Sequence, residues 1–101
     1  MLMLKEGVKI DLMQPQIALA ASIIEMCYRE IGMECVITAG NDGQHMSESR
    51  HYAGKAIDVR TRTVPEGSLD HLVGRIRECL GKNYDVVLEG DHLHVEYDPK
   101  G

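Results

Sequence analysis

Two imidazoles and one carboxylate stand in an arrangement that favours metal chemistry. The stretch 49–58 contains His51 and Asp58, and the later stretch 91–96 contains His94. A catalytic zinc ion takes three nitrogen or oxygen ligands from the protein and leaves a fourth position for water. Each of the three residues alone would be read as an ordinary surface or hydrogen-bonded side chain. Together they predict a zinc site formed by His51, Asp58 and His94.

The residues around these ligands resemble those of the zinc D-alanyl-D-alanine metallopeptidases. Relatives of that family include phage peptidoglycan endopeptidases, D,D-dipeptidases and the amino-terminal domain of hedgehog proteins. The resemblance covers roughly the last two thirds of the chain, and before Cys35 the sequence is no more than compatible with it. The matching residues are Ser49, His51, Gly54, Ala56, Asp58, Asp91 and His94. The resemblance implies zinc as the cofactor and the same three ligands.

The resemblance also assigns catalytic roles beside the metal. A bound zinc ion lowers the pKa of its water to about 7, and a base within hydrogen-bond reach must take the proton. In the family this base is an acidic residue three positions before the last His ligand, which is Asp91 here. Glu89 is the nearby alternative. His92, on the same strand face as the ligand, is predicted to donate a hydrogen bond to the oxyanion.

Substrate contacts and supporting residues are less sharply defined by the sequence. Many relatives carry an Arg in the loop before the Ser-His motif, and the corresponding loop here has none. His45, Ser49 and Arg50 are predicted to bind substrate instead, with Arg60 as a further candidate. A ligating His usually donates its second ring nitrogen to a partner. Ser49 and Glu96 are both candidates for that partner.

Length and composition place further bounds. A chain of 101 residues is expected to form a single domain over 1–101, and the resemblance implies that it is a zinc metallopeptidase domain. The net charge of −5 argues against nucleic acid or an anionic membrane surface as the main partner. The three cysteines form no Cys-x-x-Cys pair, which favours small buried hydrophobes over a disulfide framework. No apolar run approaches the ~20 residues of a membrane span.

Apolar spacing predicts two helices and several short strands. Residues 1–13 alternate weakly at Val8, Ile10 and Leu12, which indicates one short strand or an extended arm. The other expected elements are a helix over about 15–32, strands over 35–38 and 55–60, a helix from Pro65 or Ser68 to Gly81, and a hairpin of 84–89 with 92–97.

These elements predict an α+β fold in which two helices pack on one face of a mostly antiparallel sheet. The resemblance implies that this fold is hedgehog/DD-peptidase-like. Side chains alternate between the two faces of a strand, so Asp58 projects from the polar face of its strand, and His92, His94 and Glu96 share the polar face of theirs. The zinc ion is therefore expected on the face of the sheet that the helices leave open.

The sequence thus predicts a zinc-dependent peptidase that hydrolyses a peptide bond in peptidoglycan stem peptides. The bond is of the D-Ala-D-Ala carboxypeptidase or the L-Ala-D-Glu endopeptidase type. The loop without Arg is similar to that of small phage relatives and favours a phage or prophage lysin. Two alternatives stay open: a non-catalytic metal-binding module, and a phage structural component that has kept a peptidase-like fold.

The predicted partner is a peptidoglycan peptide, with no nucleic acid and no membrane, and the sequence specifies no oligomeric state. The amino terminus is too short and too soon charged for a secretory signal. We therefore expect synthesis in the cytoplasm without a signal peptide, and action at the cell wall if the protein is a lysin.

Overall fold

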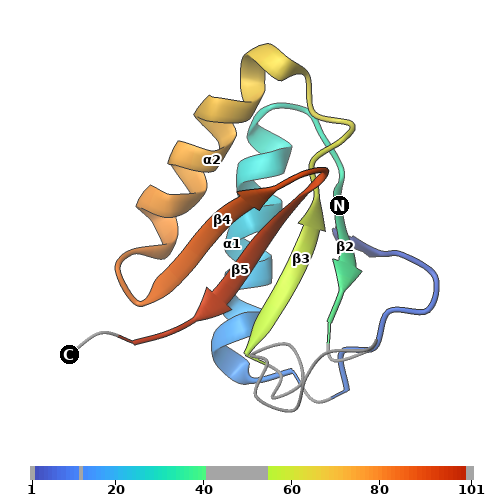
Figure 1. Cartoon of the computed structure of the whole chain (residues 1–101), viewed down its shortest axis with the longest axis vertical. Helices are drawn as coiled ribbons and strands as arrows, with labels where there is room; N and C mark the ends of the chain where they lie inside the picture. The colour runs from blue at the N-terminus through green and yellow to red at the C-terminus, as the bar shows by residue number, and fades with distance from the viewer. Residues whose placement is uncertain (1, 12, 41–54, 100–101) are drawn as a thin grey trace.

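The computed structural model describes residues 2–11, 13–40 and 55–99. Two helices and five strands form in these ranges (Figure 1). In chain order they are β1 (Leu2–Leu4), α1 (Pro15–Glu30), β2 (Cys35–Ala39), β3 (Ala56–Arg60), α2 (Glu66–Leu80), β4 (Tyr84–Glu89) and β5 (His92–Tyr97). The predicted order of helices and strands from residue 15 onward is confirmed.

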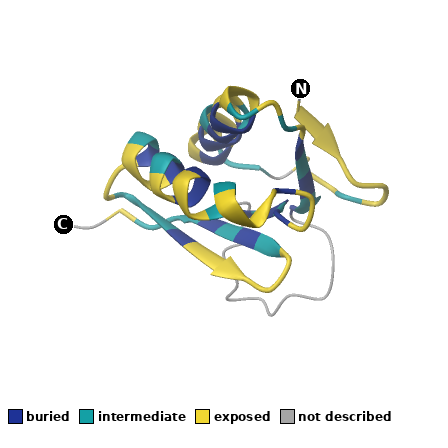
Figure 2. Cartoon of the chain, turned by 90° about the horizontal axis from the view of Figure 1, so that it is seen from above, coloured by how far each residue is buried: buried dark blue, intermediate teal, exposed yellow. Residues whose placement is uncertain are grey.

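The strands form one mixed sheet in the order β1-β2-β3-β5-β4. β1 pairs with β2 in parallel, and the remaining three pairings are antiparallel. Both helices lie on the same side of this sheet (Figure 2). The α+β class, with two helices on a mostly antiparallel sheet, is therefore confirmed.

The amino-terminal segment differs from the expected alternation. The strand is formed by Leu2–Leu4, whereas residues 8–11 belong to no strand. The amide of Lys5 still donates to the carbonyl of Ile37 at 2.9 Å, but the chain then turns at Gly7, whose φ is 88°. This left-handed conformation suits glycine. The one short strand expected within 1–13 therefore forms before the alternating residues, and Val8 packs against the core without belonging to a strand.

Local chemistry explains the ends of both helices. Pro15 occupies the first turn of α1, where its missing amide hydrogen costs no helical hydrogen bond. α1 ends at Glu30, two residues before the predicted end, and Gly32 follows with a φ of 73°. α2 begins directly after Pro65, the earlier of the two predicted starts, and ends before Gly81, whose φ is 81°.

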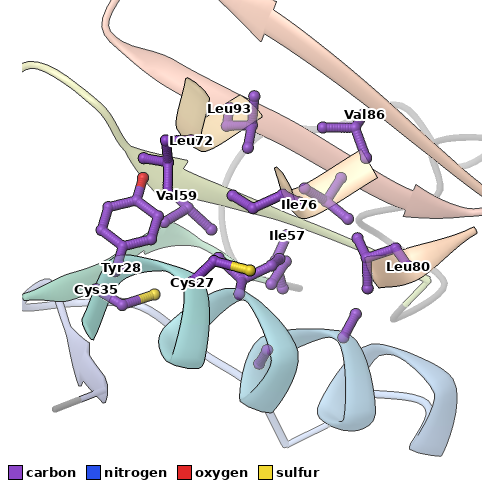
Figure 3. Close-up of a cluster of buried hydrophobic side chains, with 14 of the residues drawn as sticks. Cys27, Tyr28, Cys35, Ile57, Val59, Leu72, Ile76, Leu80, Val86 and Leu93 are labelled. Carbon is purple, nitrogen blue, oxygen red and sulfur yellow. The ribbon is translucent and has the colours of Figure 1, made fainter. Parts of the chain in front are cut away.

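The core lies between the helices and the sheet (Figure 3). It is built from aliphatic side chains and one large ring, that of Tyr28, which is fully buried. The Tyr28 hydroxyl donates a 2.7 Å hydrogen bond to the backbone carbonyl of Arg60 and so ties α1 to the end of β3. Cys27 and Cys35 are buried free thiols, and burial raises the pKa of Cys35 to about 12. Both act as small core residues, as predicted.

The face of the sheet away from the helices carries the polar side chains. Antiparallel pairing of β3 with β5 sets Asp58 opposite His94 and Arg60 opposite His92. The alternate residues Ile57, Val59, Leu93 and Val95 are fully buried. Within the described ranges, neither helix is long and apolar enough to cross a membrane.

Candidate metal centre

Asp58 and His94 meet at the middle of the open sheet face. The two residues are 36 positions apart in the chain, and the β3–β5 register makes them direct neighbours. Nδ1 of His94 lies 3.0 Å from Oδ1 of Asp58. Their side chains are 20% and 15% exposed, so both are shielded from solvent without being sealed from it. Sequence predicted both residues as ligands, and the fold places them together.

The second nitrogen of His94 is held by another carboxylate. Nε2 lies 2.8 Å from Oε1 of Glu96, two residues further along β5. A carboxylate only accepts hydrogen bonds, so both contacts are satisfied when the ring carries both protons. The bond to Asp58, followed by that to Glu96, raises the pKa of His94 to about 9 against the opposing effect of burial. Without a metal, His94 is therefore an imidazolium between two carboxylates.

This pair of atoms fits a zinc ion. Zinc binds His nitrogen and carboxylate oxygen at roughly 2.0–2.2 Å, so two donor atoms of a tetrahedral site stand about 3.3 Å apart. The 3.0 Å between Nδ1 and Oδ1 is close to that separation. A metal bound there would replace the proton on Nδ1 while Glu96 kept the hydrogen bond from Nε2, which is the usual support for a ligating imidazole. Of the two candidates for this support, Glu96 is thus in position.

The third predicted ligand, His51, lies outside the described residues. The same is true of the three residues predicted to bind substrate, His45, Ser49 and Arg50. Among described side chains, His92 is the nearest further imidazole, with Nε2 3.8 Å from Oδ2 of Asp58.

The predicted base, Asp91, and the predicted oxyanion donor, His92, lie where β3 ends and β5 begins. Asp91 is in the two-residue turn between β4 and β5, and its carbonyl accepts a 2.9 Å hydrogen bond from the amide of Thr61, just after β3. Its side chain is 72% exposed, and Nδ1 of His92 lies 3.3 Å from its Oδ1. This contact keeps the pKa of Asp91 below its usual range, so the carboxylate is ionised.

The ring nitrogens of His92 lie within 4 Å of three carboxylates. Besides the contact with Asp91, its Nε2 lies 3.6 Å from Oε1 of Glu89 and 3.8 Å from Asp58. Glu89, the alternative base, is 53% exposed and reaches the site only through His92. Asp91 and His92 both line one cavity with Asp58, whereas Glu89 does not. The geometry therefore favours Asp91 over Glu89 as the base.

Glu96 also belongs to a neighbouring acidic group, whose other members, Asp85 and Asp98, sequence reasoning missed. Carboxylate oxygens of Asp85, Glu96 and Asp98 all lie within 4.8 Å of one another. The pairing of β4 with β5 sets Asp85 opposite Glu96, so the hairpin register was the signal that could have revealed it. An all-oxygen group suits hard cations such as Ca²⁺ more than zinc. It is the one group of three potential ligands that the described residues form.

Comparison with protein-family models and with curated proteins gives no match for this sequence.

Proposed function

We propose that this protein is a zinc-dependent peptidase acting on peptidoglycan stem peptides, with a hedgehog/DD-peptidase-like fold. The observation that carries the proposal is the 3.0 Å approach of His94 Nδ1 to Asp58 Oδ1 on the open sheet face. The sequence motif indicates both residues as zinc ligands, and their two donor atoms are close enough to share one zinc ion. Glu96 contacts the other ring nitrogen of His94 and would support the imidazole as a ligand. His51 is proposed as the third ligand.

Each nearby side chain has a defined part in the proposed reaction. A bound zinc ion would supply a water of lowered pKa and polarise the scissile carbonyl. Asp91, ionised and exposed beside the cavity, accepts the proton of the attacking water and passes it to the leaving amine. His92 donates to the developing oxyanion from Nε2, a role that requires a proton on that nitrogen.

The layout of the domain agrees with this chemistry. Both helices cover one face of the sheet, and the proposed ligands Asp58 and His94 project from the other (Figure 2). β2 and β3 change register between Ile37 and Ala39, directly beside Asp58. Such irregularities are frequent next to active sites because they re-aim side chains.

Peptidoglycan digestion tests the proposal. Purified walls are incubated with zinc-loaded protein and with chelator-treated protein, and new peptide termini are read by mass spectrometry. We expect a defined fragment from the zinc-loaded protein alone, which also identifies the cleaved bond. His94→Ala should lose both zinc and cleavage, Asp91→Asn should keep zinc and lose cleavage at least about a hundredfold, and the exposed control Asp70→Asn should match wild type.

Two results would contradict the proposal. Stoichiometric zinc binding without cleavage of any wall type would leave a non-catalytic metal-binding module. A wild-type protein that binds no zinc would remove the basis of the assignment altogether.

A further inference from the structure

Two cysteines, one on each helix, lie at the same level of the contact between α1 and α2. Cys27 belongs to α1 and Cys79 to α2. The two helices touch and run in opposite directions (Figure 1). An ion pair fixes their alignment, since Nε of Arg75 on α2 lies 3.2 Å from Oε1 of Glu30 on α1. Cys27 stands three residues before Glu30 and Cys79 four residues after Arg75, so in an antiparallel pair both cysteines lie about one turn from the ion pair on the same side.

The two thiols are in contact across this helix pair. Burial, followed by the contact with the Cys79 thiol, raises the pKa of Cys27 to about 11. Axes of packed helices are about 8–10 Å apart and each Cα lies about 2.3 Å from its axis, so facing Cα atoms are separated by roughly 3.5–5.5 Å. A disulfide joins residues whose Cα atoms are about 4.4–6.8 Å apart. The helix pair therefore brings Cys27 and Cys79 within reach of one disulfide.

The three thiols differ in how far an oxidant can reach them. All three are free, but only Cys79 is half-buried. Cys27 points from α1 into the core and is 1% exposed (Figure 3), and Cys35 on β2 is fully buried. A small oxidant in solution therefore meets Cys79 first, and the thiol placed to react next is that of Cys27.

We propose that Cys27 and Cys79 form a reversible disulfide between α1 and α2 when the protein meets a peroxide. The Cys79 sulfur attacks one peroxide oxygen, the O–O bond breaks, and the leaving hydroxide departs as water with the thiol proton. The Cys27 sulfur then attacks the sulfenic acid, so that the S–S bond forms, the S–O bond breaks and a second water leaves with the Cys27 proton. The two thiols lose two electrons and one peroxide gains them. A dithiol reductant restores both thiols by exchange.

The disulfide would act on the stability of the fold. It closes the chain between residues 27 and 79, a segment that holds β2 and β3. Closing a loop of this length restricts the unfolded chain, so the oxidised protein should melt about 10 °C higher than the reduced protein. Cys27 lies in the core between helices and sheet, whereas Asp58 and His94 project from the other face. The disulfide is therefore independent of the proposed peptidase activity.

The test counts and maps thiols in the whole chain. Reduced protein is treated with hydrogen peroxide, then unfolded and labelled with a thiol reagent in acid, where exchange is slow. Mass spectrometry of unreduced peptides identifies the linkage. We expect the oxidised protein to be labelled at Cys35 alone, with the peptides of Cys27 and Cys79 linked to one another. Dithiothreitol should restore labelling of all three cysteines.

Cys79→Ser is the decisive variant, because a half-buried position tolerates serine even if the buried Cys27 does not. After peroxide treatment it should keep both remaining thiols and show no rise in melting temperature. Cys35→Ala is the matched control and should form the same disulfide as wild type.

Four results would overturn the proposal. They are full labelling of all three cysteines after peroxide treatment, a link from Cys79 to Cys35 or to a second copy of the chain, oxidation of Cys79 to an acid while Cys27 is still labelled, and an oxidised protein that melts no higher than the reduced protein.

Discussion

Replacing Glu96 with Gln should weaken zinc binding without removing a ligand. Oε1 of Glu96 lies 2.8 Å from Nε2 of His94, and both side chains are about four-fifths buried, at 21% and 20% exposure. Gln keeps the shape and an oxygen that accepts from Nε2, but it loses the negative charge that makes the imidazole a stronger ligand. Changes to such supporting carboxylates cost about 10- to 100-fold in metal affinity, or roughly 1.4–2.8 kcal/mol.

The assay is zinc titration against a competing chelator at fixed pH, with circular dichroism confirming that each variant is folded. Glu34→Gln is the matched control, because Glu34 is an exposed residue between α1 and β2 and does not line the cavity that Asp58 lines. Asp58→Asn should abolish tight binding, since it removes a proposed ligand. Glu96→Gln should fall between Asp58→Asn and the control.

A further variant separates this site from the neighbouring acidic group. Glu96 also belongs to the cluster with Asp85 and Asp98, so a metal held there would likewise be lost on its replacement. Asp85→Asn should leave zinc affinity within about threefold if zinc binds between Asp58 and His94, because Asp85 lies on β4 opposite Glu96 and is not itself a proposed ligand. The reasoning is refuted if Glu96→Gln binds zinc as tightly as wild type. It is also refuted if Asp85→Asn loses as much zinc affinity as Glu96→Gln.

Three other predictions follow from described contacts. Tyr28→Phe removes the part-buried 2.7 Å hydrogen bond that the Tyr28 hydroxyl donates to the Arg60 carbonyl, so thermal unfolding should show a loss of about 0.5–1.5 kcal/mol, or about 4–8 °C for each kcal/mol. In metal-free protein the pKa of His94 is raised from 6.5 to about 9, chiefly by Asp58. This shift stabilises the folded protein by up to roughly 3 kcal/mol. The stabilisation is complete below pH 6.5 and is lost as pH rises through 9. The free energy of unfolding in urea should therefore decline over this range, and His94→Gln should remove most of that decline. Gly40→Ala would place its methyl group against the backbone carbonyl of Lys9. Denaturant unfolding of this variant should therefore show a clear loss of stability. A variant as stable as wild type would contradict this contact.

Local pattern was sufficient to identify most of the fold. In α1, Ile17, Ala20, Ile24 and Cys27 recur at helical spacing, and all are buried. In β5, the alternation of apolar and polar residues alone predicted that Leu93 faces the core and His94 the opposite face, and Leu93 is buried whereas His94 is half-buried. The alternation at Val8 and Ile10 did not locate the amino-terminal strand at Leu2–Leu4, because an apolar alternation does not reveal whether a partner strand is in reach.

The sequence by itself determined which residues offer metal chemistry and on which face of their strands they stand. The alternation of side chains along a strand is local, so Asp58 and His94 could be assigned to polar faces without knowledge of the fold. Glu96 could be proposed as a supporting residue, but only as one candidate of two.

Only the tertiary structure decided how these residues meet. The choice of β5 as neighbour of β3, and the register that sets Asp58 opposite His94, depend on hydrogen bonds and packing between segments 36 residues apart. The same pairing puts Nδ1 toward Asp58 and Nε2 toward Glu96. The pairing of β1 with β2 brings Lys5 from the amino-terminal segment to the cavity that Arg60 and Arg62 line. Such long-range pairing is not encoded in any short window of sequence, because its energy is gained only when the whole sheet and its helical cover have formed.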